Sequence, residues 1–180
     1  MKDRRSLDKK YLLTGLPGSG KSTVIMRCVG LLRMEGLRVG GISTPELREK
    51  GRRIGFKVVD LASGREALMA GVNIPSIHRV GRYGVDIAAF ESVALPALDD
   101  AEKRFDVVVI DEIGRMEFYS TMFRRRIIEL LKGPITLIAA VHRDYADLYG
   151  KYGTLLWISQ ENRDELPMSL ASQVLRSPLR

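Results

Sequence analysis

The chain has 180 residues, of which 45% are hydrophobic and 28% are charged, a balance typical of one globular domain with an ordinary core. No apolar run approaches the ~20 residues that a membrane helix needs, and no apolar signal-peptide core follows the charged residues 1–10. We therefore expect a cytoplasmic protein without a membrane span, in which residues 1–10 form a charged tail. The formal net charge of +7 favours polyanionic partners such as nucleoside triphosphates, RNA or DNA.

The first segment combines two strands, a glycine-rich loop and a helix. Residues 11–14 form a short apolar run that ends at the loop, which is typical of a buried strand. From Ser22 to about Met34 the apolar positions recur at helical spacing, and residues 38–43 predict a second strand. The order strand, loop, helix, strand predicts a parallel sheet. Cys28 is the only cysteine, which excludes an intramolecular disulfide, and its place on the apolar stripe of the helix predicts a small buried side chain.

The middle of the chain departs from this alternation. Residues 53–61 and 65–70 flank a short glycine-containing turn and predict a β-hairpin inserted into the α/β pattern. Residues 73–85 contain one proline and two glycines and are expected to be mostly loop. Residues 86–104 carry an amphipathic helical pattern, which we expect Pro96 to bend or split.

The second half of the chain alternates buried strands with helices. We expect strands over residues 105–110, 135–141 and 154–159, and helices over residues 120–131, 144–149 and from about 161 onward. The run at 105–110 is continuously apolar, which is typical of a strand covered on both faces. Ser120 or Thr121 can cap the helix that follows it. Residues 1–180 are therefore predicted to form a single three-layer α/β domain of about five parallel strands with an inserted hairpin.

A P-loop connects the first strand to the first helix. The segment 15–22 fits the pattern G-x-x-x-x-G-K-[ST] in full. Its glycines let successive backbone N–H groups point into one concavity, and the positive end of the following helix favours a phosphate there. Lys21 is expected to reach the β- and γ-phosphates, and the Ser22 hydroxyl to bind Mg²⁺. The predicted phosphate-binding residues are Gly15, Leu16, Pro17, Gly18, Ser19, Gly20, Lys21, Ser22 and Thr23.

Two adjacent carboxylates end the strongest predicted strand. Asp111 stands where a Walker B acid belongs and is expected to hold Mg²⁺ through water. Glu112 follows at once, and a carboxylate beside the metal site can orient an attacking water or take its proton. The segment expected to border the nucleotide comprises Val108, Val109, Ile110, Asp111, Glu112, Ile113 and Gly114.

An arginine is the usual partner of the charge that builds on the γ-phosphate during transfer. Arg48 and Arg53 lie just after the second strand, and Arg115 follows the acidic pair; all three are candidates for this catalytic role, as is Arg52. Each of them is also compatible with an ordinary surface charge. His142, at a strand end, is compatible either with sensing the γ-phosphate or with no role.

The late loop offers a weak signal for the base. Asn162 or Arg163 can line a base pocket, because the loop after the last strand often does so in such folds. A role for Asn162 at the start of the last helix is equally compatible with the sequence.

Several segments together resemble a known family, the THEP-type nucleoside-triphosphatases, called cancer-related nucleoside-triphosphatase in animals. The resemblance runs from Leu12 to about Leu166 and rests on the segments GLPGSGKST, ISTPELREKGRRIGF, GRYGVD followed by Phe90-Glu91, VVVIDEIGRME followed by Ser120 and Phe123, and Glu161-Asn162-Arg163. It implies a RecA-like sheet in which another strand lies between the P-loop strand and the Walker B strand. It also implies slow, Mg²⁺-dependent hydrolysis of ATP, GTP and other nucleotides with little base selectivity.

The same resemblance favours Arg48 and Arg53, which match arginines of the family. Two features depart from the family pattern. Arg115 stands where lysine is more common, which keeps the charge and changes its geometry. Residues 1–10 are additional to the family's usual start.

Three functions remain open from the sequence. The first is a nucleoside-triphosphatase that uses Lys21, Glu112 and Mg²⁺ to direct water at the γ-phosphate. The second is a P-loop kinase, with the hairpin and residues 73–85 as a lid over a nucleoside, nucleotide or other small acceptor. The third is a nucleic-acid-stimulated ATPase, which the net charge motivates, although the chain carries no recognised RNA- or DNA-binding motif.

Overall fold

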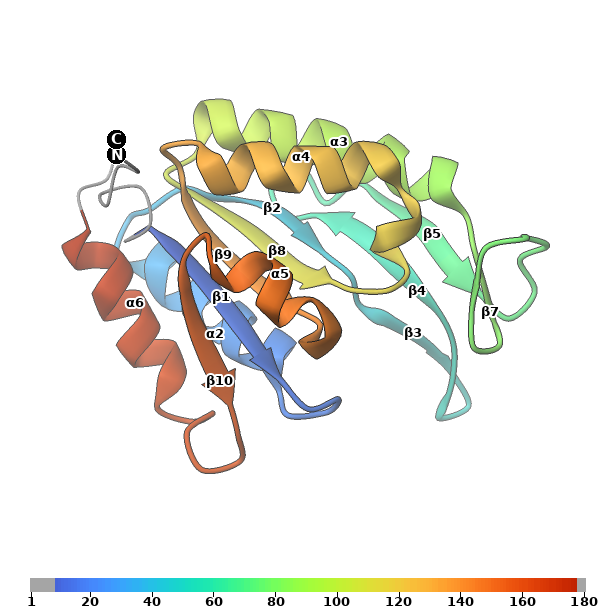
Figure 1. Cartoon of the computed structure of the whole chain (residues 1–180), viewed down its shortest axis with the longest axis horizontal. Coiled ribbons are helices and arrows are strands. Elements are labelled where there is room, and N and C mark those ends of the chain that lie inside the picture. Colours follow the sequence, from blue (N-terminus) through green and yellow to red (C-terminus); the bar gives the residue numbers. More distant parts are fainter. Residues whose placement is uncertain (1–8, 178–180) are drawn as a thin grey trace.

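A computed structural model describes residues 9–177, in which one mixed sheet forms the centre of the molecule (Figure 1). Five neighbouring strands pair in parallel in the order β10-β1-β9-β8-β2. Their bounds are β1 Lys10–Gly15, β2 Val39–Ser43, β8 Val107–Ile113, β9 Thr136–Val141 and β10 Thr154–Ile158. The prediction of about five parallel strands is confirmed. So is the strand expected between the P-loop strand and the Walker B strand, because β9 lies between β1 and β8.

An antiparallel extension continues the sheet beyond β2. Its strands are β3 Glu46–Glu49, β4 Arg52–Asp60, β5 Glu66–Gly71, β6 Arg79–Val80 and β7 Tyr83–Val85. The predicted hairpin is the pair β4–β5. The segment expected to be mostly loop contains the short hairpin β6–β7, which pairs with β5, and β3 pairs with β4 where no strand was expected. Gly84 of β7 packs closely against the loop between β5 and β6, because a Cβ there would lie 2.1 Å from the carbonyl oxygen of Ile74.

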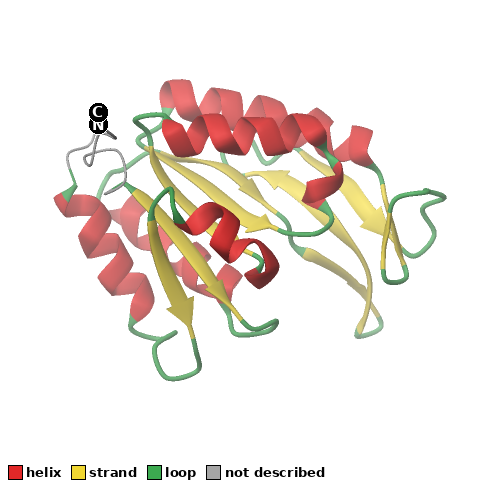
Figure 2. Ribbon diagram, in the orientation of Figure 1, coloured by secondary structure: helices red, strands yellow, loops and turns green. Residues whose placement is uncertain are grey.

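Helices cover both faces of the parallel strands, which gives three layers (Figure 2). The helices are α2 Lys21–Met34, α3 Ile87–Arg104, α4 Thr121–Lys132, α5 Ala146–Gly150 and α6 Leu166–Arg176. The core divides accordingly, with α2 and α6 packed on one face and α3, α4 and α5 on the other. No helix within residues 9–177 has both the length and the apolar character to cross a bilayer.

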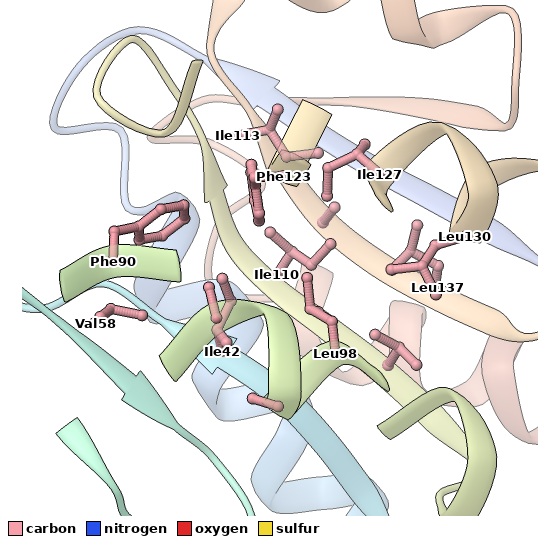
Figure 3. Close-up of a cluster of buried hydrophobic side chains, with 14 of the residues drawn as sticks. Ile42, Val58, Phe90, Leu98, Ile110, Ile113, Phe123, Ile127, Leu130 and Leu137 are labelled. Carbon is pink, nitrogen blue, oxygen red and sulfur yellow. The ribbon is translucent and has the colours of Figure 1, made fainter. Parts of the chain in front are cut away.

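Alternation along β8 explains its continuous apolar run. Val109 points to the α2 side, whereas Ile110 points to the α3 and α4 side. Figure 3 shows Ile110 among side chains from the sheet and from both covering helices, including Phe90 and Phe123. These two rings meet edge to face with their centroids 4.9 Å apart. The strand that carries the acidic pair is therefore held by packing on both faces.

The start of the parallel unit differs from the expected tail. Lys10 is the first residue of β1, is fully buried and donates its amine to the carbonyl oxygen of Ile135, so the predicted tail over residues 1–10 is wrong at Lys10. Residues 1–8 lie outside the described part of the chain. The prediction for Cys28 is confirmed, since it is fully buried and burial raises the pKa of its thiol to about 12.

Two helix predictions are corrected by the structure. Of the two expectations for Pro96, the split is wrong, since α3 runs unbroken, whereas the bend stays a prediction; the proline is exposed, so water can satisfy the carbonyl group that loses its partner. The last helix begins at Leu166 rather than near Glu161. The preceding turn is closed by Asn162, whose Oδ1 accepts from the Ser159 N–H at 3.0 Å. The helix α4 begins as expected, with the Ser120 side chain accepting from Phe123 N.

The contact between β2 and β8 tolerates no side chain at Gly41. Its φ is +117°, and an added Cβ would lie 2.0 Å from the carbonyl oxygen of Val109. Gly64 also has a left-handed φ, +75°, but has open space around it. We expect Gly64→Ala to cost about 1–2 kcal/mol of unfolding free energy, and Gly41→Ala to cost a further ~1–3 kcal/mol. Urea unfolding followed by circular dichroism measures both; equal losses would show that β2 does not approach β8 this closely.

Candidate active site

The loop between β1 and α2 has the backbone that a phosphate cradle needs. Gly18 and Gly20 have φ values of +76° and +98°, which residues with a side chain rarely adopt. The Ser19 N–H donates to the Leu16 carbonyl at 3.1 Å and closes the loop on itself. Lys21 folds back over it, with its Nζ 3.3 Å from the carbonyl oxygen of Gly15 and 3.2 Å from that of Leu16. The amine is therefore kept at the mouth of the loop.

Asp111 and Glu112 lie near the carboxyl end of β8 and line the same cavity as this loop. Asp111 is only 5% exposed, and its Oδ2 accepts from the Thr44 N–H at 3.3 Å. Its Oδ1 is buried and has no hydrogen-bond partner among the described residues. Burial raises the pKa of Asp111, while the Ser22 hydroxyl, the Thr44 N–H and the charge of Lys21 oppose that rise. The carboxylate thus keeps one buried acceptor that no described residue satisfies.

Electrostatics connect these groups. Burial raises the pKa of Glu112, and Lys21 opposes the rise while Asp111 adds to it. Burial lowers the pKa of the Lys21 amine, and both carboxylates act against that shift. One half-buried cation therefore faces two acids with raised pKa values, an arrangement typical of functional sites.

One cavity of about 1050 Å³ unites the loop with the acidic pair. The P-loop and the first turns of α2 form one wall. The other walls come from Asp111, Glu112 and His142 and from the start of the antiparallel extension. The cavity is lined by Gly15, Pro17, Gly18, Gly20, Lys21, Ser22, Thr23, Met26, Arg27, Ser43, Thr44, Pro45, Glu46, Arg53, Phe56, Asp111, Glu112 and His142.

Of the candidate arginines, Arg53 lines this cavity. Its Nη1 lies 2.5 Å from Glu46 Oε1, its Nε donates to the Tyr83 hydroxyl at 3.1 Å, and its guanidinium stands 5.3 Å from the centre of the Phe56 ring. Arg48 approaches the same carboxylate from the other side, with its Nη2 2.6 Å from Glu46 Oε2, and does not line the cavity. The Arg53 side chain is consequently fixed in direction.

Arg115 and Arg52 do not line the cavity. The Arg115 Nη2 lies 2.5 Å from Asp144 Oδ2, and the Asp144 N–H donates to His142 Nδ1 at 3.3 Å. Arg115 is therefore linked to the cavity indirectly, through Asp144 and then His142. Burial lowers the pKa of His142.

The late loop approaches the P-loop through Arg163. A Cβ added to Gly20 would lie 3.7 Å from the Arg163 Cδ, which places this side chain beside the cradle. The Asn162 side chain is occupied within its own turn, because its Nδ2 donates to the Trp157 carbonyl at 2.8 Å and its Oδ1 accepts from Ser159. Of this pair, Arg163 therefore lies beside the P-loop, although neither residue lines the cavity.

Sequence reasoning gave no role to Thr44, Glu46 or Glu117. Thr44 and Glu46 follow the carboxyl end of β2. Ligands bind at the carboxyl ends of parallel strands, so their position after the predicted strand could have marked both residues as candidates. Glu117 is 4% exposed, and its Oε2 accepts from the Gly114 N–H at 3.0 Å. Burial first, and then the nearby Glu112, raise the pKa of Glu117 to about 8. Only the three-dimensional turn after β8 reveals this buried acid.

The parallel sheet, the glycine cradle at a helix start and the buried acid on a nearby strand define a P-loop α/β nucleotide-binding protein. A family model described as NTPase matches residues 10–171. The chain therefore belongs to the NTPase family, and the resemblance seen in the sequence is confirmed.

Similar proteins agree with this assignment. The nucleoside-triphosphatase THEP1 of Methanothermobacter thermautotrophicus is 50% identical over 134 residues, covering 74% of this chain and 76% of that protein. The nucleoside-triphosphatase THEP1 of Pyrococcus abyssi is 41% identical over 157 residues, 87% of each. The crystal structure of THEP1 from Aquifex aeolicus aligns with a TM-score of 0.82 at 31% identity, covering 93% of this chain and 99% of that one. The solution structure of a human cancer-related nucleoside triphosphatase aligns with a TM-score of 0.81 at 32% identity, covering 94% and 99%.

The buried Glu117 should give the stability a pH dependence of known sign. Its pKa of about 8 in the folded chain lies above the value of ~4.3 for an unfolded glutamate, so between these values only the unfolded chain releases the proton. The free energy of unfolding therefore falls as pH rises. We expect Glu117→Gln to remove a slope of about 1.4 kcal/mol per pH unit between pH 5 and 8. Urea unfolding at several pH values tests this, with the exposed Glu35→Gln as control; parallel pH curves for wild type and Glu117→Gln would contradict it.

Proposed function

We propose that this protein hydrolyses the γ-phosphate of nucleoside triphosphates in a Mg²⁺-dependent reaction within the cavity described above. The observation that carries the proposal is that the glycine cradle, Lys21, Asp111 and Glu112 all open onto one cavity. The names of the similar proteins, nucleoside-triphosphatase THEP1, support the same activity.

The P-loop and the start of α2 are proposed to bind the phosphates. The backbone N–H groups around Gly18 and Gly20 and the positive end of the helix favour a polyphosphate there. Lys21, already held at the loop mouth, exchanges its two carbonyl contacts for the β- and γ-phosphate oxygens. Its partial burial makes the exchange favourable, because the amine then gains an anionic partner.

The residues present fit a magnesium ion. Asp111 offers a buried carboxylate oxygen without a partner among the described residues, and the Ser22 hydroxyl stands beside the same carboxylate. Oxygen donors of this kind are the ligands that Mg²⁺ prefers, with water and phosphate oxygens completing its shell. We propose that Ser22 and Asp111 hold the ion, which when bound neutralises charge on the β- and γ-phosphates.

Glu112 is proposed to orient the attacking water and to receive its proton. It lines the cavity beside Asp111, and burial raises its pKa, which makes the carboxylate a stronger base than a solvated glutamate.

Arg53 is proposed to face the charge that develops on the γ-phosphate. Its clamp through Glu46 and Tyr83 keeps the guanidinium in place without a costly rearrangement during the reaction.

Low base selectivity is part of the proposal. The exposed side chains of Thr23, Met26 and Arg27 form the cavity wall along α2. They offer an apolar surface and a cation, which contact any base rather than reading a particular edge. We therefore propose that ATP, GTP and other nucleoside triphosphates are all substrates.

Phosphoryl transfer to a small acceptor is a second candidate function, favoured by the extent of the cavity. Beyond Glu112 it continues to Glu46, Arg53 and Phe56, which leaves room for a molecule other than water. Incubation with candidate nucleosides and nucleotides distinguishes the two: a phosphorylated product would favour transfer, and free phosphate at an unchanged rate favours hydrolysis.

Removal of the Lys21 amine should abolish most nucleotide binding. We expect Lys21→Ala to weaken the affinity for a fluorescent ATP analogue by roughly 10- to 100-fold, because two charge-assisted contacts to phosphate are lost. Lys103→Ala, at an exposed position on α3, is the matched control and should bind as wild type does. Wild-type affinity in Lys21→Ala would remove the phosphate role of this residue.

Glu112→Gln should separate binding from turnover. The amide keeps the size of the side chain but cannot accept the proton of water, so we expect kcat to fall by roughly 10²- to 10³-fold while nucleotide affinity stays within a few-fold. Phosphate release and binding are measured on the same preparation, with Glu35→Gln as control. A kcat equal to that of wild type would show that another group activates the water.

A further inference from the structure

Gly114 brings two carboxyl groups together behind the catalytic strand end. A Cβ built on Gly114 would lie 3.0 Å from Glu112 Oε1 and 2.9 Å from Glu117 Oε2. Both carboxyl groups therefore pack against the same side of the Gly114 Cα, in the space that any other residue would fill. The missing side chain is what allows Glu112 and Glu117 to share this space.

Glu117 is anchored more firmly than Glu112. Its Oε2 accepts from the Gly114 N–H at 3.0 Å, and the Phe118 N–H donates to the Gly114 carbonyl at 3.1 Å, so side chain and backbone close the turn together. The Glu117 carbonyl accepts from the Ser120 N–H at 3.0 Å, at the capped start of α4. Glu117 is thus tied at one end to the loop after β8 and at the other to a helix packed in the core.

This packing restricts the direction of Glu112. With Glu117 filling the space behind Gly114, the Glu112 carboxylate has the cavity as its open side. Burial and the proximity of Glu112 raise the pKa of Glu117 to about 8, so Glu117 is mostly uncharged at neutral pH. An uncharged neighbour can pack against the Glu112 carboxylate without adding a second negative charge beside it.

We propose that Glu117 is a positioning residue for hydrolysis, which holds the Gly114 backbone and directs the Glu112 carboxylate into the cavity. The proposal rests on the proposed function, since it assumes that Glu112 orients the attacking water. It assigns to Glu117 no contact with the nucleotide. Its consequence is that disturbing Gly114 or Glu117 lowers kcat and leaves nucleotide affinity unchanged.

Gly114→Ala is the first test. Gly114 does not have a left-handed φ, so alanine suits its backbone, yet the new methyl group must displace the two carboxyl groups. We expect kcat to fall by about 10- to 100-fold with the affinity for a fluorescent ATP analogue unchanged, because a misplaced catalytic group costs about that much. Gly30→Ala is the matched control, since a Cβ at that exposed position of α2 meets nothing within 4 Å.

Substitution of Glu117 itself is the second test. Glu117→Gln keeps the size of the side chain, is uncharged and can still accept from the Gly114 N–H, so we expect kcat within about threefold of wild type. Glu117→Leu removes the acceptor, so we expect a fall of about tenfold or more in kcat at unchanged affinity. A purely structural role would lower the melting temperature without this separation of kcat from affinity and without rescue by glutamine.

The outcomes separate this proposal from the proposed function. If wild type releases no phosphate from any nucleoside triphosphate, the function itself fails. If wild type turns over, while folded Gly114→Ala and Glu117→Leu both keep its kcat, only the positioning role is overturned. Should Glu117→Leu fail to fold, Gly114→Ala decides the question, with its melting temperature and nucleotide affinity as controls. A loss of kcat in Glu117→Gln equal to that in Glu117→Leu also overturns the proposal, because shape and acceptor would then not suffice.

Discussion

The burial of Asp111 is the constraint on which the site depends. Taking a carboxylate out of water is costly unless charges and hydrogen bonds replace its hydration. Here one oxygen accepts a backbone N–H from Thr44, and the other has no partner among the described residues. The strand can hold such a group at its end because its other residues are packed on both faces of the sheet, so the cost of one acid is set against a large apolar core. A cation and a polyphosphate are the natural complement of this arrangement.

The parts of the fold that could be predicted are those that local sequence determines. The P-loop, the apolar run of β8 and the Ser120 cap each require particular residues at fixed spacing, so their positions follow from the sequence. The short strands β3, β6 and β7 exist because they pair with neighbours already in place, and no local pattern announces them. Pro96 likewise leaves α3 intact because tertiary packing and the solvent-facing position of the ring outweigh its local effect.

The same division holds for the candidate site. Lys21, Asp111 and Glu112 were expected together because the carboxyl ends of parallel strands meet at one edge of a sheet. Position alone could not rank the arginines, because Arg48, Arg53 and Arg115 all stand near predicted strand ends, and the family resemblance favoured Arg48 and Arg53 without separating them. Their ion pairs distinguish them: Glu46 holds Arg53 at the cavity wall, and Asp144 holds Arg115 outside it. The Glu46–Arg53 pair forms within the antiparallel extension, and the Arg115–Asp144 pair joins the turns after β8 and β9, so neither pair belongs to a sequence motif.

Glycine matters at two places in this site, in the P-loop and after β8. At Gly18 and Gly20 the lack of a Cβ permits the backbone to curl around a phosphate. At Gly114 the backbone is ordinary, and the lack of a Cβ instead makes room for two carboxyl groups. On the proposed function, the first use serves phosphate binding and the second serves the direction of the Glu112 carboxylate, so the two can be altered independently. Because the turn that holds Glu117 also starts α4, the proposed direction of the Glu112 carboxylate depends on the helix-packed core as well as on β8. On the proposed function, a carboxylate supported in this way keeps its direction while the other side of the cavity accepts nucleotides with different nucleobases.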